Sequence, residues 1–219
     1  MRKDKIDYSK SKKYYNFTRT ELIEMLPFLC GRFLEIGCGA GGTLEYLKSK
    51  GASYVAGIDI NKEAIEIASK RGLDFVMVAD VEKDELPFKD REFDCIILAD
   101  VIEHFYNPWD TLKKITHHLK NEGFILMSIP NIKYYKVLMS LILRDEWTYS
   151  EAGILDNTHI RFFTLKEIKK LLDYAGLKIV EIRWNASTGR KFRIINALLF
   201  NKLSSFSIVQ YYIAVTKLE

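Results

Sequence analysis

The sequence predicts an α/β fold, in which helices cover both faces of a doubly wound, mostly parallel sheet. Two observations predict it. Between residues 31 and 130, short apolar runs rich in β-branched residues alternate with stretches of helical periodicity, as in successive strand–helix–strand units. The runs at residues 93–99 and 123–129 are almost continuously apolar, which is typical of strands buried on both faces of a parallel sheet.

The elements of this region follow one another in a regular order. We expect strands at residues 32–36, 54–60, 74–79, 93–99 and 123–129. The segments between them carry apolar residues at helical spacing, and we expect helices at residues 43–50, 63–70 and 108–119. The sheet therefore accounts for most of the chain up to Pro130.

A different pattern follows Pro130. Residues 131–163 mix aromatic and charged side chains, with a short apolar helix near residues 137–143. Thr164 is the expected N-cap of the next helix, because Glu167 lies three residues on and completes a capping box. Gly176 is in the position of a C′ glycine, which ends that helix.

The last part of the chain contains two more expected strands, at residues 177–184 and 207–216. Between them, residues 193–203 form a helix with one apolar face. We expect that face to pack against the domain, with a dimer contact as the alternative.

Composition indicates a globular protein without a membrane span. The 219 residues suffice for one domain, and 48% are hydrophobic and 28% charged. No apolar run approaches the ~20 residues that cross a bilayer, and no signal segment follows the basic start. The odd number of cysteines, without metal-ligand spacing, indicates free thiols and a cytoplasmic location. The net charge is +4, with six Lys or Arg in the first 13 residues; we expect a solvated tail, with nucleic-acid or anionic-surface binding as the alternative.

A glycine-rich loop at residues 35–42 connects the first strand to the first helix of the sheet. Glycine allows a ligand to approach the backbone closely, and the helix that follows offers unpaired N–H groups. Its spacing fits two cofactors. Gly37, Gly39 and Gly42 match the dinucleotide fingerprint G-x-G-x-x-G, whereas Gly37, Gly39 and Gly41 match the G-x-G-x-G of enzymes that use S-adenosylmethionine (SAM).

Acidic residues at successive strand ends favour SAM. Glu35, Asp59, Asp80 and Asp100 end or follow the first four expected strands, and ligands bind at the carboxyl ends of the strands in such sheets. A pyrophosphate would be repelled by these carboxylates. SAM presents a sulfonium, an ammonium, an exocyclic amine and ribose hydroxyls, all of which are cations or hydrogen-bond donors that carboxylates attract.

Together these motifs resemble the class I SAM-dependent methyltransferases, and the resemblance covers most of the chain. Leu34–Gly41 is similar to their first motif, and residues 57–60 to the second. Residues 79–81 resemble the segment that recognises adenine. Residues 93–97, leading to Glu103 and His104, resemble the fourth-strand motif of the ubiquinone-biosynthesis-like O-methyltransferases. The resemblance implies a Rossmann-like sheet of seven strands, the last antiparallel.

The resemblance also implies the cofactor contacts. In the loop they are Glu35, Gly37, Cys38, Gly39 and Gly41. Beyond it, the ribose is expected at Asp59, adenine at Ile60, Asp80 and Val81, and the reactive end at Ala99 and Asp100. Residues 14–19 are similar to an N-terminal lid in relatives, in which Arg19 would meet the SAM carboxylate and Tyr14 would cover the cofactor.

Two histidines are candidates for a general base, because an unperturbed histidine titrates near neutrality. His104 lies just past the fourth expected strand. His159 lies in residues 156–164, which resemble D-x-x-H-x-R-x-F-T segments of methyltransferases acting on sugars or other glycan precursors. We favour His159, with Arg161 orienting it or binding an anionic substrate. Tyr134 and Trp147 are further candidates for substrate contact.

Glu103 and His104 are too few ligands to indicate a metal site, so none is assigned. We expect a single methyltransferase domain: an N-terminal lid (residues 1–29), a SAM-binding core (30–130), a substrate-side insert (131–163), and C-terminal elements (164–219) with a helical insert at 190–204. The expected activity is O-methylation of a small molecule or a sugar or glycan precursor by a monomer or homodimer, without a nucleic-acid partner. A nicotinamide-dependent oxidoreductase, an RNA methyltransferase and a non-catalytic SAM-binding module are the alternatives.

Overall fold

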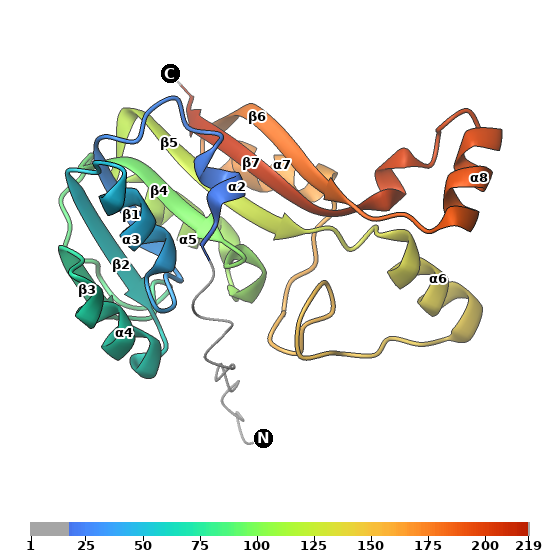
Figure 1. The fold of residues 1–219 in the computed structure, drawn as a ribbon, viewed down its shortest axis with the longest axis horizontal. Coiled ribbons are helices and arrows are strands. Elements are labelled where there is room, and N and C mark those ends of the chain that lie inside the picture. Colours follow the sequence, from blue (N-terminus) through green and yellow to red (C-terminus); the bar gives the residue numbers. More distant parts are fainter. Residues whose placement is uncertain (1–17, 219) are drawn as a thin grey trace.

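The computed structural model describes residues 18–218, which form a seven-stranded sheet flanked by helices (Figure 1). The strand order is β3-β2-β1-β4-β5-β7-β6. The strands β1 to β5 pair in parallel with one another, and β7 is antiparallel to both β5 and β6. The strands are β1 (Arg32–Ile36), β2 (Tyr54–Asp59), β3 (Phe75–Val78), β4 (Phe93–Ala99), β5 (Leu119–Pro130), β6 (Leu177–Ala186) and β7 (Ile208–Lys217). The predicted seven-stranded fold with an antiparallel last strand is confirmed.

Helices connect these strands and lie on both sides of the sheet (Figure 1). The α-helices are α2 (Thr20–Ile23), α3 (Gly42–Ser49), α4 (Lys62–Ala68), α5 (Pro108–Thr116), α6 (Tyr135–Arg144), α7 (Leu165–Tyr174) and α8 (Arg190–Leu198). Short 3-10 segments are η1 (Ser69–Arg71), η2 (Ile102–His104) and η3 (Ser204–Ser207).

Two hydrophobic clusters form the core, one on each face of the sheet. One contains Leu112 of α5 and Ile168 of α7, and the other contains Leu22 of α2 and Leu44 of α3. Each central strand therefore buries side chains on both faces, as the continuous apolar runs predicted. The rigid sheet fixes the loops at its carboxyl edge, where the candidate site lies.

Most predicted boundaries differ from the observed ones by one or two residues, but those of α5, β5 and α8 differ more. The helix expected at residues 193–203 spans Arg190–Leu198. The helix expected at residues 108–119 ends at Thr116, and β5 begins at Leu119 rather than at residue 123. The predicted cap of α7 is present: the Thr164 side chain accepts a hydrogen bond from the Glu167 backbone. The Glu167 side chain accepts a hydrogen bond from Lys170.

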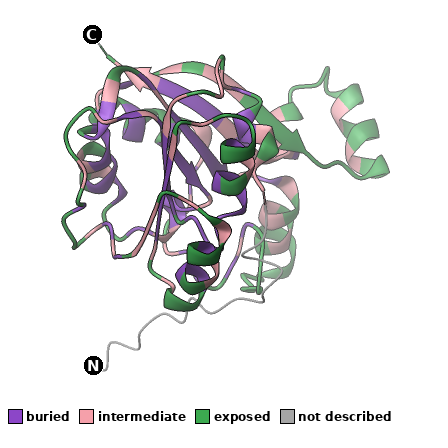
Figure 2. Ribbon diagram, turned by 60° about the vertical axis from the view of Figure 1, so that its left-hand side comes forward, coloured by how far each residue is buried: buried purple, intermediate pink, exposed green. Residues whose placement is uncertain are grey.

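The helix in the β6–β7 connection is the main correction to the sequence analysis. α8 was expected to pack its apolar face against the domain, but it has no buried residue. β6 and β7 carry it away from the rest of the sheet (Figure 1), and Figure 2 shows it as an exposed projection. Helical periodicity reveals an apolar face without revealing whether anything covers it.

Candidate functional site

The glycine loop between β1 and α3 has the backbone that only glycine adopts easily. Gly37, Gly39 and Gly41 all have positive φ angles, of 72°, 53° and 79°. A Cβ atom at Gly37 would also overlap a methyl group of Val101. The loop is therefore specified by its glycines, since other residues are strained in this region.

Asp59, at the end of β2, holds this loop in place. One of its carboxylate oxygens accepts a hydrogen bond from the Gly39 backbone N–H at 2.8 Å, and the other accepts one from Asn61 at 2.8 Å. Burial raises the pKa of Asp59, and these backbone donors oppose that rise. The side chain of the next residue, Ile60, is 47% exposed, so an apolar surface lies beside the carboxylate.

Glu35, in β1, lies directly before the glycine loop and is almost completely buried, with 3% of its surface exposed. Burial raises its pKa to about 8, although the Thr43 hydroxyl and the Arg19 charge oppose the rise. Within the described residues its Oε2 has no hydrogen-bond partner. A buried polar atom without a partner is uncommon and calls for a ligand or water.

Three further predicted cofactor contacts differ in their surroundings. Cys38 is buried, and burial together with the nearby acids raises the pKa of its thiol. Asp80, after β3, forms an ion pair with Lys83 and accepts a hydrogen bond from the Glu82 backbone at 3.1 Å. Val81 beside it is buried.

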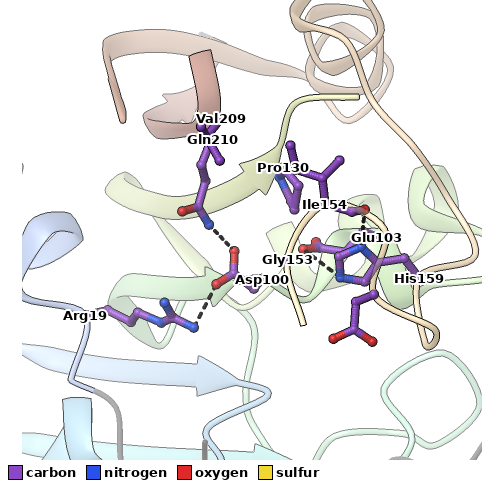
Figure 3. Close-up of a pocket in the computed structure, with 10 residues that line it drawn as sticks. Arg19, Asp100, Glu103, Pro130, Gly153, Ile154, His159, Val209 and Gln210 are labelled. Carbon is purple, nitrogen blue, oxygen red and sulfur yellow. Dashed lines mark hydrogen bonds and ion pairs between the residues drawn. The ribbon is translucent and has the colours of Figure 1, made fainter. Parts of the chain in front are cut away.

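Asp100, directly after Ala99 at the end of β4, is the centre of a polar cluster (Figure 3). Its φ of 54° is unusual for a residue with a side chain. Its carboxylate pairs with Arg19 at 2.7 Å, accepts a hydrogen bond from the Ser128 hydroxyl at 2.8 Å, and accepts another from the Gln210 amide. Contacts from several elements thus hold Asp100 in this conformation.

A second cluster brings both predicted histidines together with Glu103. The rings of His104 and His159 lie 4.8 Å apart, edge to face. The Nε2 atom of His159 is 3.8 Å from a carboxylate oxygen of Glu103, which is 1% exposed. Backbone hydrogen bonds of 3.0 Å from Ile160 and Arg161 to the Glu103 carbonyl hold the His159 loop against η2.

The hydrogen bonds of the two histidines determine their tautomers. The Nδ1 atom of His159 lies 3.0 Å from the Ile154 carbonyl, and that of His104 lies 3.0 Å from the Thr158 carbonyl. A carbonyl only accepts, so each Nδ1 carries the hydrogen. In the neutral ring Nε2 then holds a lone pair.

Charge at this cluster is suppressed by burial. Burial and the nearby Asp100 raise the pKa of Glu103 well above its ordinary value. Burial and the adjacent His159 lower the pKa of His104. Within the described residues, neither carboxylate oxygen of Glu103 has a hydrogen-bond partner. Burial therefore disfavours the charged forms of both Glu103 and His104.

A cavity of about 270 Å³ joins the two clusters. Figure 3 shows Arg19, Asp100 and Gln210 on one side of it and Glu103 and His159 on the other. Its remaining walls come from the end of β5, the loop before His159 and the start of β7: Pro130, Gly153, Ile154, Asp156 and Val209. The cavity therefore unites segments far apart in the sequence.

Comparison with known proteins identifies the chain. The family model described as a methyltransferase domain matches residues 11–182. The chain belongs to this methyltransferase family. It is a class I SAM-dependent methyltransferase, whose sheet order and antiparallel β7 are those of that fold. The oxidoreductase alternative is therefore wrong. It rested on a glycine spacing that both classes of enzyme share.

Individual relatives agree with this assignment. An uncharacterized protein of Methanocaldococcus jannaschii is 36% identical over 156 residues, which are 69% of this chain and 66% of that protein, just under two thirds of its length. The ubiquinone biosynthesis O-methyltransferase of Neisseria meningitidis serogroup A is 26% identical, over 77% of this chain and 73% of that protein. A SAM-dependent methyltransferase structure from Archaeoglobus fulgidus has a TM-score of 0.68 at 22% identity, over 90% of this chain and 92% of that one.

The residues of the methyltransferase fit SAM. The glycine loop is too closely packed to carry side chains at Gly37 and Gly41, whose Cβ atoms would overlap Val101 and Leu73, so its backbone is free to face a ligand closely. The orphaned Oε2 of Glu35 is a buried acceptor. Because SAM carries an ammonium and a sulfonium, an edge lined by the carboxyl groups of Glu35, Asp59 and Asp100 offers it oxygen atoms of complementary polarity.

Several predicted site residues lie elsewhere. The Arg161 guanidinium bonds the Tyr106 carbonyl and lies over the Trp109 ring, with 5.7 Å to its centroid, so it does not orient His159. Tyr134 is buried against Tyr135, and Trp147 packs against Phe162. None of these three lines the cavity. Tyr14 lies outside the described residues.

Sequence reasoning missed Gln210, which reaches Asp100 from a strand 110 residues away. It also passed over the role of Asp156, whose carboxylate accepts hydrogen bonds from the backbone and hydroxyl of Thr158 at 2.9 and 2.7 Å and so shapes the His159 loop. An Asp-x-Thr spacing indicates such a turn; nothing in the sequence indicates the Gln210 contact.

Proposed function

We propose that the methyltransferase methylates a hydroxyl oxygen of a small molecule or a sugar or glycan precursor, with His159 as the general base. The observation that carries the proposal is the buried Glu103–His159 pair in the wall of a cavity beside Asp100. When bound, SAM supplies a methyl group on an electrophilic sulfonium. A hydroxyl must lose its proton as it attacks, and a basic imidazole nitrogen serves that step.

The proposed proton path uses the tautomers described above. The acceptor hydroxyl gives its proton to His159 Nε2, while Nδ1–H stays bonded to the Ile154 carbonyl. Glu103 lies 3.8 Å from the same Nε2. In its ionised form Glu103 would stabilise the imidazolium that forms, because an adjacent opposite charge is strong in a buried site, and the single proton that leaves the hydroxyl then stays on His159. His104 is the second candidate for a catalytic role, behind His159.

The cofactor contacts proposed for this chain are those named from the sequence. Asp59 would hold the ribose hydroxyls and Ile60 would cover adenine, with Asp80 and Val81 at the adenine edge. Glu35 and the glycine loop would hold the amino-acid end, and Ala99 and Asp100 would border the sulfonium. Arg19 is proposed to meet the SAM carboxylate, exchanging its Asp100 partner for it.

Two observations support a small hydroxyl acceptor. The cavity volume of about 270 Å³ is near the lower end of the roughly 300–1,000 Å³ range of small-molecule sites. The Neisseria relative is named an O-methyltransferase, which supports oxygen as the acceptor atom. RNA methylation is the alternative.

Production of S-adenosylhomocysteine, measured with panels of phenols, sugars, matched amines and tRNA, tests the acceptor class. We expect turnover with a hydroxyl acceptor, and His159→Gln to reduce kcat about 100-fold to 10,000-fold with unchanged SAM affinity. His117→Gln is the matched control, since His117 is exposed on the C-cap of α5. Turnover confined to amines or tRNA, or wild-type kcat in His159→Gln, would contradict the proposal.

Metal binding is the second candidate role for the cluster of Glu103, His104 and His159. Ligand-type atoms of Glu103, His104 and His159 lie within 4.8 Å of one another, and three protein ligands are the number used by catalytic zinc sites. In the general-base proposal, dialysis against EDTA leaves the rate unchanged. A loss of activity that Zn²⁺ or Mg²⁺ restores would assign the cluster to a metal instead.

A further inference from the structure

Two helices at one end of the molecule expose large apolar side chains. α6 and α8 project together beyond the end of the sheet opposite β3 (Figure 1). Leu198 and Phe200, at the end of α8, are 74% and 88% exposed, and Ile142 of α6 is 73% exposed. Neither helix has a buried residue. The exposed side chains Met139, Ile142, Leu143, Ile195, Leu198 and Phe200 are called the distal patch below.

The two helices are joined at their bases. The ring of Tyr135, at the start of α6, stacks on Phe192 of α8 with centroids 4.3 Å apart. The Tyr135 hydroxyl accepts a hydrogen bond of 3.1 Å from the Gly189 backbone. These contacts hold the helices at one surface, where both can meet a single partner.

The charge of α8 and the residues that flank it is one-sided. Residues 186–207 contain no Asp or Glu, but they contain four basic residues: Arg190, Lys191, Arg193 and Lys202. Three of these lie in the first four residues of α8, which has no acidic residue in its first turn. A helix start is stabilised by negative charge, so these cations lie where an anionic surface would favour the helix most.

We propose that the distal patch docks on an anionic membrane surface, with its apolar side chains in the headgroup region and the α8 cations on the lipid phosphates. Amphipathic helices with this division of residues bind in the plane of the interface. Within residues 18–218, no helix is long and apolar enough to cross a membrane, so the contact is peripheral. The inference is independent of the proposed acceptor.

A second copy of the chain fits this surface less well. In a two-fold contact the same patch meets itself, which would bring the Arg190, Lys191 and Arg193 clusters of two protomers together.

The loop after α6 carries Asp145, Glu146 and Glu151, and Glu146 lies 3.9 Å from Arg144. Because these acidic residues lie beside α6, we assign only apolar contact with the membrane to α6, and we assign the electrostatic attraction to the lipid phosphates to the basic residues of α8.

Cosedimentation of the full chain with vesicles tests the proposal. At about 0.1 M salt we expect binding to vesicles of roughly 30% phosphatidylserine in phosphatidylcholine, and little binding to pure phosphatidylcholine. Arg190→Gln/Lys191→Gln/Arg193→Gln should weaken binding about 100-fold, because each basic residue near such a surface contributes roughly fivefold. Leu198→Ser/Phe200→Ser should also release the protein, and its circular dichroism should be unchanged because both side chains are exposed.

The matched control removes three exposed lysines from the opposite end: Lys50→Gln/Lys62→Gln/Lys70→Gln should bind vesicles like the wild type. The proposal is overturned if the wild type does not bind anionic vesicles. It is also overturned if the α8 variants bind like the wild type, since the basic N-terminal residues would then be responsible. A dimer in light scattering that Leu198→Ser/Phe200→Ser dissociates, without vesicle binding, would assign the patch to a second copy.

Discussion

Replacing Glu35 by Gln should stabilise the methyltransferase at neutral and alkaline pH while weakening its hold on SAM. Glu35 is buried before the glycine loop, and its Oε2 lacks a partner within the described residues. Gln keeps the shape of the protonated carboxyl but cannot ionise. The substitution therefore removes the cost of a buried charge and, with it, the negative charge that Glu35 can offer the cofactor ammonium.

The size of the effect follows from the pKa. Folding raises the pKa of Glu35 from 4.5 to about 8, so the folded state holds this proton more tightly than the unfolded state. Its contribution to stability is present in full below pH 4.5 and is lost as the pH rises towards 8. At about 1.4 kcal/mol for each pH unit between these values, the loss reaches at most ~5 kcal/mol.

Urea unfolding of wild type and Glu35→Gln at intervals from pH 5 to 9 measures this directly. We expect the variant's advantage in unfolding free energy to be small near pH 5 and to grow with pH until about 8. Other buried acids titrate in both proteins and cancel in the difference. Glu122→Gln, at an exposed position, should show no such trend. A difference between wild type and Glu35→Gln that is independent of pH would refute the reasoning.

Three further predictions concern the loop and the two clusters. Gly37→Ala should cost about 2 kcal/mol or more of unfolding free energy, because alanine is strained at a φ of 72° and its Cβ overlaps Val101; a loss below 0.5 kcal/mol in urea unfolding would contradict this. Gln210→Leu removes a hydrogen-bond donor to Asp100 and should weaken SAM binding several-fold, as measured by calorimetry. Unchanged affinity would show that Gln210 of β7 does not contribute to the cofactor site. His104→Asn should reduce kcat less than His159→Gln does. A larger loss of kcat in His104→Asn would make His104 the general base and contradict the choice of His159.

The fold could be predicted because its strands have a clear physical signature. β1 and β4 were predicted at their observed bounds, since a strand buried on both faces needs a continuous apolar run. The boundary between α5 and β5 was wrong because Leu119 continues the helical spacing of Leu112 and Ile115, although it is the first residue of the strand. A single apolar residue at such a position is compatible with the periodicity of a helix and also with that of a strand.

The site was predictable where it depends on strand ends. The acids and the glycine loop meet at one edge because parallel strands place their carboxyl ends together. The approach of His159 to Glu103 was not predicted, since it depends on a loop closed by tertiary hydrogen bonds. Arg161 was expected beside His159 from its sequence position, but its side chain points to Tyr106 and Trp109 instead.

Calorimetry with SAM tests the central claim most directly, using the wild type, Asp59→Ala and a surface control, Asp173→Ala. We expect micromolar affinity for SAM and S-adenosylhomocysteine in the wild type and the control, and a loss of tenfold or more in Asp59→Ala, which is about 1.4 kcal/mol. SAM binding absent from the folded wild type, or unchanged in Asp59→Ala, would contradict the assignment of this edge of the sheet as the cofactor site.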